Sequence, residues 1–364
     1  MKTYQLILAS ALVALAACTK EEVVNTDVNL DSNEIGFNAV TQRATKANDA
    51  IISGTTYATD GTNTFQVWGW QSAKDGNSGD NIAFSDVNNN AASNFMSNLT
   101  ISYCGGRLHR DAAWRNADNY YYWPFTGKIS FLAVHPSTVA SSVTAKWDAE
   151  NKKPKATIAD YTITPDSNET TDLMFATNEG SRQADPLNMV FKHALSQIEV
   201  QVKTDQDYSA DVAFDVESVT FNNIDLSGDV AYVNNVISWS DNAAQTQSWV
   251  YCNDVLEDIT KDYQVYGAAK VMIPQLANTL NPDATPDPDT VQATITIGYS
   301  MEQTGSAKIT GTVTIADPFL SVAANQWEAG KKYNYTINFR LNEILFNPSV
   351  TDWVDVDVTT INIY

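Results

Sequence analysis

Basic residues are scarce in this chain. Lysine and arginine number 22 among 364 residues, against 43 aspartate and glutamate residues, and the formal net charge at pH 7 is −21. A surface of this sign repels the phosphates of nucleic acids and of anionic membranes, so neither is expected to bind it. Strong negative charge is instead typical of a soluble, exposed surface protein.

Histidine is also scarce, and the sequence lacks the patterns of a catalytic or metal centre. His109, His135 and His193 have no histidine or cysteine partner at zinc-finger or metalloprotease spacing. The chain has no Gly-x-Ser-x-Gly elbow, no phosphate-binding glycine loop and no pair of carboxylates that stands out. We therefore expect no enzyme activity, no catalytic residue, no metal and no cofactor, and we expect His193 to be structural.

An apolar run opens the chain but is too short to span a bilayer. It covers residues 6–17 after the basic Lys2 and ends in Leu-Ala-Ala-Cys at Cys18, whereas a transmembrane helix needs roughly 20 apolar residues. The length fits a secretory signal, and the ending is similar to the bacterial lipobox. We expect residues 1–17 to be a lipoprotein signal peptide with lipid on Cys18; the alternative is an ordinary signal peptide in which Cys18 is incidental. Residues 18–33 then form an acidic, flexible tether.

Two cysteines remain beyond the leader. Cys104 and Cys252 are far apart in the sequence. An oxidising compartment would permit one disulfide between them, although the role of a lone small apolar residue is favoured for each. The sequence leaves both possibilities open.

The rest of the chain has the patterning of β-strands. Apolar and polar residues alternate strictly, as in antiparallel sheets with one packed face, over residues 198–203, 291–297, 307–315 and 333–341. Residues 129–134 are nearly all apolar, which predicts a central strand covered on both faces. Helical signal is weak, with short turns expected at 111–117 and 323–329.

The length of the chain predicts about two domains. Residues 179–186 form a polar stretch, and strongly alternating sequence begins soon after it. We place a domain boundary there, with one β-sandwich domain over residues 34–186 and a second over residues 187–364.

An ordered series of local patterns resembles the fimbrillin family, the lipoprotein subunits of type V pili. The resemblance covers nearly the whole chain and rests on residues 34–40, 41–47, 120–124, 133–136, 172–176, 191–198, 272–275 and 327–335. It implies an all-β fold with two antiparallel sandwich domains of transthyretin-like topology, in tandem after the signal peptide. It also implies attachment to the outer membrane through lipid, a place at the cell surface in a pilus, and other pilus subunits as partners in adhesion.

The resemblance further implies assembly by strand exchange. In this family a protease cuts the lipid-tethered precursor after a basic residue, the first strand leaves, and a strand of another subunit fills the vacated groove. Ile35, Phe37 and Ala39 alternate with Gly36 and Asn38, so they would enter one groove together.

The cut and the donor strand can also be placed on this sequence. Arg43 is the expected cleavage site, with Lys46 as the alternative, although Arg43 could also be a solvated loop charge. The donor strand is expected at the C-terminus, where apolar residues alternate and change phase at 359–360; they are Val354, Val356, Val358, Ile361 and Ile363. The same segment could instead be the last strand of the second domain, and the sequence does not distinguish a shaft subunit from a tip or an anchor.

A second function class is a surface lipoprotein that captures glycans for uptake. The chain has nine Trp and sixteen Tyr, which could stack on sugars. Trp68 and Trp70 share one strand face opposite Phe65 and Val67, so one of these pairs could be exposed.

Overall fold

The computed structural model describes residues 33–41, 63–72, 93–104, 113–125, 127–163, 172–183, 185–208, 210–241, 247–275, 293–316, 326–340 and 343–352. Within these ranges the regular elements are β-strands apart from one short 3-10 turn, η3 (Ser137–Val139). The all-β fold class is therefore confirmed. The helical turn expected at 111–117 is wrong, because β4 (Ala113–Asn116) pairs there with two neighbouring strands.

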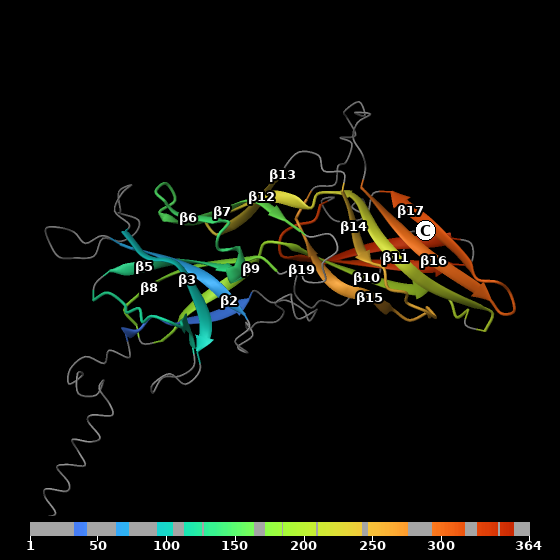
Figure 1. Ribbon diagram of the computed structural model, residues 1–364, viewed down its shortest axis with the longest axis horizontal. Coiled ribbons are helices and arrows are strands. Elements are labelled where there is room, and N and C mark those ends of the chain that lie inside the picture. Colours follow the sequence, from blue (N-terminus) through green and yellow to red (C-terminus); the bar gives the residue numbers. More distant parts are fainter. Residues whose placement is uncertain are drawn as a thin grey trace, which may run out of the picture.

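Seven strands form a sheet that closes on itself as a barrel, on the left of Figure 1. Their order around the barrel is β1-β4-β3-β2-β5-β8-β9. The neighbours pair antiparallel except β1 and β9, which run parallel. Besides β4, the bounds are β1 (Phe37–Thr41), β2 (Thr64–Gln71), β3 (Ser93–Cys104), β5 (Lys128–His135), β8 (Met174–Ser181) and β9 (Leu187–His193).

Strand β5 is covered on both faces, as its apolar run predicts. Phe131 and Ala133 belong to the cluster of buried residues that also contains Ile35, Phe37 and Ala39. Leu132 and Val134 alternate with them and belong to a second cluster. The barrel therefore has one core inside and presents a second apolar face outside.

A four-stranded sheet covers that outer face. Its order is β13-β12-β7-β6, and it draws on distant parts of the chain (Figure 1). The rings of Tyr232 and Phe175 stack with centroids 5.2 Å apart, and Trp147 lies 6.5 Å from Trp70. The bounds are β6 (Val143–Asp148), β7 (Lys153–Thr162), β12 (Ser227–Val233) and β13 (Val236–Asp241).

The C-terminal half contains two more four-stranded sheets. One has the order β15-β10-β18-β19 and the other β14-β11-β16-β17. The four alternating segments predicted from the sequence correspond to β10, β16, β17 and β18. The bounds are β10 (Ser196–Thr204), β11 (Val212–Ile224), β14 (Gln247–Cys252), β15 (Gln264–Met272), β16 (Thr294–Gln303), β17 (Ile309–Ala316), β18 (Lys331–Arg340) and β19 (Glu343–Asp352).

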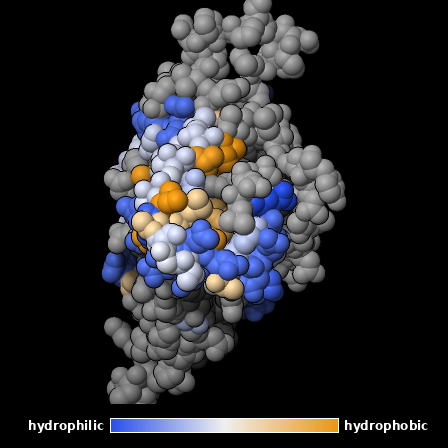
Figure 2. Space-filling view, turned by 90° about the vertical axis from the view of Figure 1, so that its right-hand side faces the viewer, coloured by the Kyte–Doolittle hydropathy of each residue, from blue (hydrophilic) through white to orange (hydrophobic). Residues whose placement is uncertain are grey.

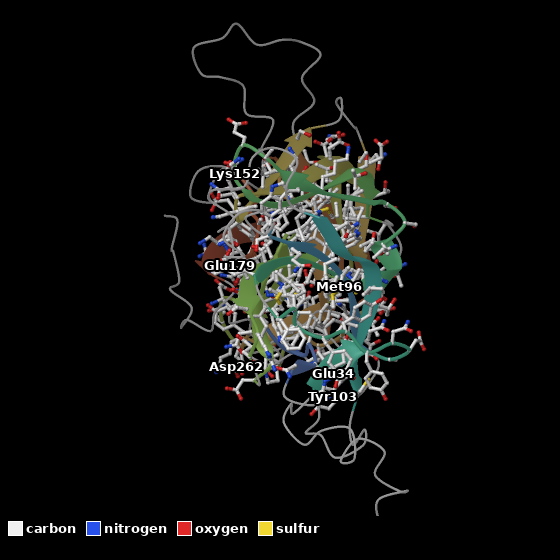
Figure 3. The ribbon with its side chains drawn as sticks, turned by 90° about the vertical axis from the view of Figure 1, so that its left-hand side faces the viewer. Glu34, Met96, Tyr103, Lys152, Glu179 and Asp262 are labelled. Atoms are coloured by element: carbon white, nitrogen blue, oxygen red, sulfur yellow. The ribbon has the colours of Figure 1, made fainter. Side chains whose placement is uncertain are left out.

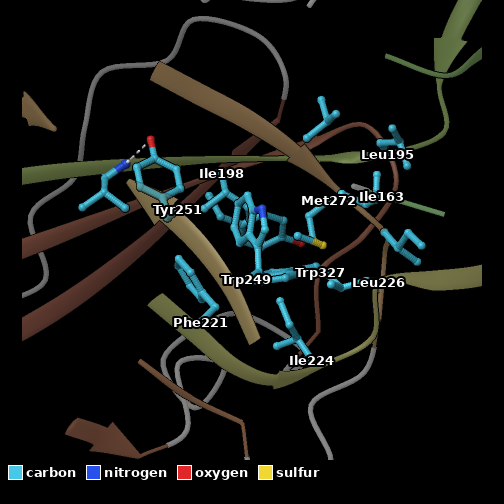
Figure 4. Packing of buried hydrophobic residues seen from close by; sticks show 14 of the residues in the cluster. Ile163, Leu195, Ile198, Phe221, Ile224, Leu226, Trp249, Tyr251, Met272 and Trp327 are labelled. Carbon is cyan, nitrogen blue, oxygen red and sulfur yellow. Dashed lines mark hydrogen bonds between the residues drawn. The ribbon is translucent and has the colours of Figure 1, made fainter. Parts of the chain in front are cut away.

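Aromatic side chains fill the core of this half (Figure 4). Phe221 lies 5.3 Å from Trp249 and 5.7 Å from Trp327, measured between ring centroids. The Tyr251 hydroxyl accepts the Val200 N–H at 3.2 Å (Figure 4) and donates to the Ala268 carbonyl at 2.8 Å. These bonds allow large polar aromatics to be buried at low cost.

The two halves meet at the short segment between β9 and β10. The boundary we drew between residues 186 and 187 lies before β9, which pairs with β8 and β1 and so belongs to the barrel sheet. The polar stretch before it begins with the last residues of β8 and connects β8 to β9. The Trp239 indole N–H donates to the Ala194 carbonyl at 2.7 Å, and the Gly330 N–H donates to the Leu195 carbonyl at 2.9 Å. The segment between β9 and β10 is thus held by hydrogen bonds from residues that are distant in the sequence.

Candidate functional site

Strand β1 closes the barrel by lying between two strands that do not pair with each other. It pairs in parallel with β9 from Phe37–Leu187 to Thr41–Phe191, and it pairs antiparallel with β4 at Phe37–Trp114. Without β1, the sheet would be an open one with β4 and β9 as its edges. The site is therefore a strand-shaped groove that this chain fills with its own first strand.

The side chains of β1 and the residues before it enter the barrel core. Ile35, Phe37 and Ala39 are 3%, 1% and 4% exposed. The Phe37 ring packs edge-on against Phe131 at 5.2 Å and against Phe65 at 6.4 Å. This edge-to-face geometry is favourable for aromatic pairs. The slot for Phe37 is thus built by side chains from other strands of the barrel.

Backbone bonds extend the pairing beyond the N-terminal end of β1. The Ile35 N–H donates to the Tyr121 carbonyl at 2.7 Å, and the Trp123 N–H donates to the Asn33 carbonyl at 2.7 Å. On the other side, the Leu187 N–H donates to the Gly36 carbonyl at 2.8 Å. The leading segment is consequently held along both of its edges.

Two arginines contact the residues that precede β1. The Arg115 Nε lies 3.7 Å from Glu34 Oε1, and both side chains are 7% exposed. The Arg182 Nε donates to Asn33 Oδ1, and its guanidinium lies 4.9 Å from the centroid of the Phe125 ring. Figure 3 shows Glu34 and Tyr103 at the same end of the barrel. Two basic side chains thus line the N-terminal end of the groove. Local sequence patterns do not reveal these contacts, because the paired residues are far apart along the chain.

Several residues of the sequence-based hypothesis lie outside the described residues. They are Cys18, Arg43, Lys46, Val354, Val356, Val358, Ile361 and Ile363. The strand before the C-terminal segment, β19, pairs with β18 from Lys331–Asp352 to Arg340–Glu343 and ends its sheet. Cys104 and Cys252 are free thiols.

The aromatic surface suggested for glycan binding is wrong for Trp68 and Trp70. Both are only 6% exposed, because the sheet formed by β6, β7, β12 and β13 covers the face on which they lie. Phe65 and Val67 are buried on the opposite face inside the barrel. The end of the molecule on the right of Figure 1 faces the viewer in Figure 2, and it carries small hydrophobic areas among hydrophilic residues.

A buried polar group lies where β8 and β9 meet. His193 Nδ1 and Asp172 Oδ2 share a hydrogen bond. Burial raises the pKa of Asp172, and the neighbouring His193 opposes this rise. Burial lowers the pKa of His135 to about 3, although the Thr64 carbonyl, 3.1 Å from its Nδ1, acts in the opposite direction. These groups are enclosed by the fold and support its packing.

Within the described ranges, no three or more His, Cys, Asp or Glu side chains come together as a metal site. The same ranges contain no helix with the length and apolar character needed to cross a membrane.

Comparison with known proteins identifies similar chains. Residues 43–353 match the model of a family described as fimbrillin-like. A fimbrial protein from Bacteroides vulgatus is 16% identical with a TM-score of 0.61, over 88% of this chain and 100% of that one. The tip fimbrial protein Mfa3 from Porphyromonas gingivalis, with a C-terminal truncation, is 9% identical with a TM-score of 0.34, over 88% and 99%. The first of these shows the same fold. No curated protein matches the chain.

Proposed function

The chain belongs to the fimbrillin-like family, and on that premise we propose that it is a pilus subunit that assembles by exchange of its first strand. The family consists of fimbrial and adhesion proteins of the cell surface rather than of enzymes. In this proposal the signal peptide directs export, Cys18 receives the lipid, and the acidic tether holds the precursor at the outer membrane. Other pilus subunits and a maturation protease are its partners. Two domains make up the mature subunit, one containing the barrel and the other the two C-terminal sheets.

The position of β1 carries the proposal. It fills the gap between β4 and β9, and its apolar side chains lie in the barrel core. A cut after Arg43, or after Lys46, would leave β1 held by hydrogen bonds and packing alone. Burial of a large side chain such as Ile35 or Phe37 is worth roughly 1.5–3 kcal/mol, so loss of the strand exposes an apolar slot and two unpaired edges. Such edges favour the addition of another strand.

The C-terminal segment is the proposed donor. It follows β19, which is the edge strand of its four-stranded sheet. Its sequence offers Val354, Val356 and Val358 in one phase and Ile361 and Ile363 in the other. A strand of this pattern can place one row of apolar side chains in a groove. The alternative of glycan capture draws no support from Trp68 and Trp70, because both are buried.

Limited trypsin treatment of the purified chain tests this function. We expect filaments by electron microscopy after cleavage and none before it. Comparison of the Arg43→Gln variant with Lys46→Gln, its matched control, shows after which of the two residues trypsin must cut for filaments to form. A chain that ends at Trp353 should be cleaved normally but should not polymerise. Filaments from uncleaved chains, or from the shortened chain, would contradict the proposal.

A further inference from the structure

Two arginines at the groove contact residues that would leave together with the first strand. Arg115 lies on β4, beside the Glu34 carboxylate, and Arg182 follows β8, bonded to the Asn33 amide. Both partners precede β1 in the chain, so a cut after Arg43 removes them together with the strand. Both arginines stay with the mature subunit. The emptied groove would therefore have positive charge at the end where the leaving segment entered.

The loss is most serious at Arg115, which is 6% exposed. Removing one member of a buried ion pair is strongly unfavourable where the other member stays buried, as it would when a new strand fills the groove. A replacement strand without a carboxylate at this place would bury Arg115 without the ion pair that Glu34 supplies. A strand that carries an acidic residue at the position of Glu34 would restore the pair.

We propose that Arg115 selects the replacement strand by pairing with a carboxylate three positions before the residue that fills the Phe37 slot. This inference rests on the proposed strand exchange and adds the rule by which the groove recognises its partner. The rule also fixes register, because a shift of two residues would move the carboxylate away from Arg115.

The C-terminal segment of a second copy meets this rule at one register. Glu34 is followed by Ile35, Phe37 and Ala39 at steps of one, three and five residues. The segment repeats the acidic place and the two apolar places with matching steps in Asp355, Val356 and Val358, and the polar Thr360 stands at the place of Ala39. Starting from Asp357 gives a poorer match, because the third and fourth places then fall on the polar Thr360 and Asn362. The occupant that fits is therefore this segment, running in the direction of β1, with Asp355 beside Arg115.

Peptide binding to the cleaved chain, purified from its released segment, tests the rule. The probes are a peptide of residues 353–364, its Asp355→Asn version and, as the matched control, its Asp357→Asn version. Fluorescence anisotropy gives the dissociation constants. We expect Asp355→Asn to weaken binding at least about tenfold, as loss of a buried charge pair requires, and the control to change it less than about threefold. In the Arg115→Met chain the two substitutions should have equal effects.

The outcomes separate this rule from the function on which it rests. If no peptide binds the cleaved chain, strand exchange is refuted and the rule with it. If the peptides bind but Asp355→Asn and Asp357→Asn have equal effects on the wild-type chain, the rule alone is overturned. The peptide series on the wild-type chain decides even if Arg115→Met fails to fold.

Discussion

Replacing Phe37 with alanine should destabilise the precursor and leave the mature subunit unchanged. The ring is 1% exposed and packs against Phe131 and Phe65. Loss of its burial costs roughly 1.5–3 kcal/mol, and the cavity left between the two partner rings adds to this. Measured substitutions of this kind cost about 3–5 kcal/mol in total, a large share of the roughly 5–15 kcal/mol that stabilises a typical domain.

Urea unfolding of the barrel, followed by tryptophan fluorescence, measures this effect. The uncleaved Phe37→Ala precursor should lose about 3–5 kcal/mol relative to the wild-type precursor. The control is Asn38→Ala, at the neighbouring position, where an exposed side chain donates to Asn188; it should change stability by less than about 0.5 kcal/mol.

The cleaved chain supplies the second half of the test. Once β1 has left, the mature subunits of wild type and Phe37→Ala have the same sequence and must unfold alike. Equal stability of the two precursors would refute the reasoning, because β1 would then contribute nothing to the barrel. Different stability of the two cleaved, purified chains would show that the segment had stayed bound.

Three further predictions concern the packing around the groove and the junction. Gly180→Ala should cost about 1–3 kcal/mol, because a Cβ there would lie 2.7 Å from the Trp123 ring; the tryptophan emission should shift with it. The pKa of His135 falls from 6.5 to about 3 on folding, so the unfolded chain takes up a proton first as the pH drops. Stability is then full above pH 6.5 and declines toward pH 3 by up to about 1.4 kcal/mol per unit, and urea unfolding at pH 4.5 and 7 should show a smaller decline in His135→Asn. Trp239→Phe removes the bond to the Ala194 carbonyl and should cost about 1 kcal/mol in the same assay; no loss would show that this bond does not fix the junction.

Alternation along single strands was enough to predict much of the fold. Strands β10, β16 and β18 bury one row of apolar side chains, and Val313 and Ile315 of β17 pack against the same core, so their period of two is visible in the sequence. The nearly continuous apolar run of β5 indicated burial on both faces, and the two clusters on either side of it confirm this. In each case the signal was local.

Features that depend on distant strands were missed. Trp68 and Trp70 were expected on a face that could be exposed, but β12 and β13, from far along the chain, complete the sheet that covers them. The pairing of Glu34 with Arg115 likewise joins residues that no local pattern connects. β4 had weak helical signal, and its pairing with β1 and β3 overrides that preference.

A disulfide between β1 and β9 tests most directly whether β1 must leave for the subunit to assemble. Asn38 and Asn188 are register partners on the two strands, and their side chains meet at 3.1 Å. In a chain with Asn38→Cys and Asn188→Cys, and with Cys104 and Cys252 replaced by serine, trypsin should cut normally while the disulfide keeps β1 in place. Light scattering should show no polymer under oxidising conditions and polymer growth once a reductant is added. Polymer growth while the disulfide is intact would contradict the account.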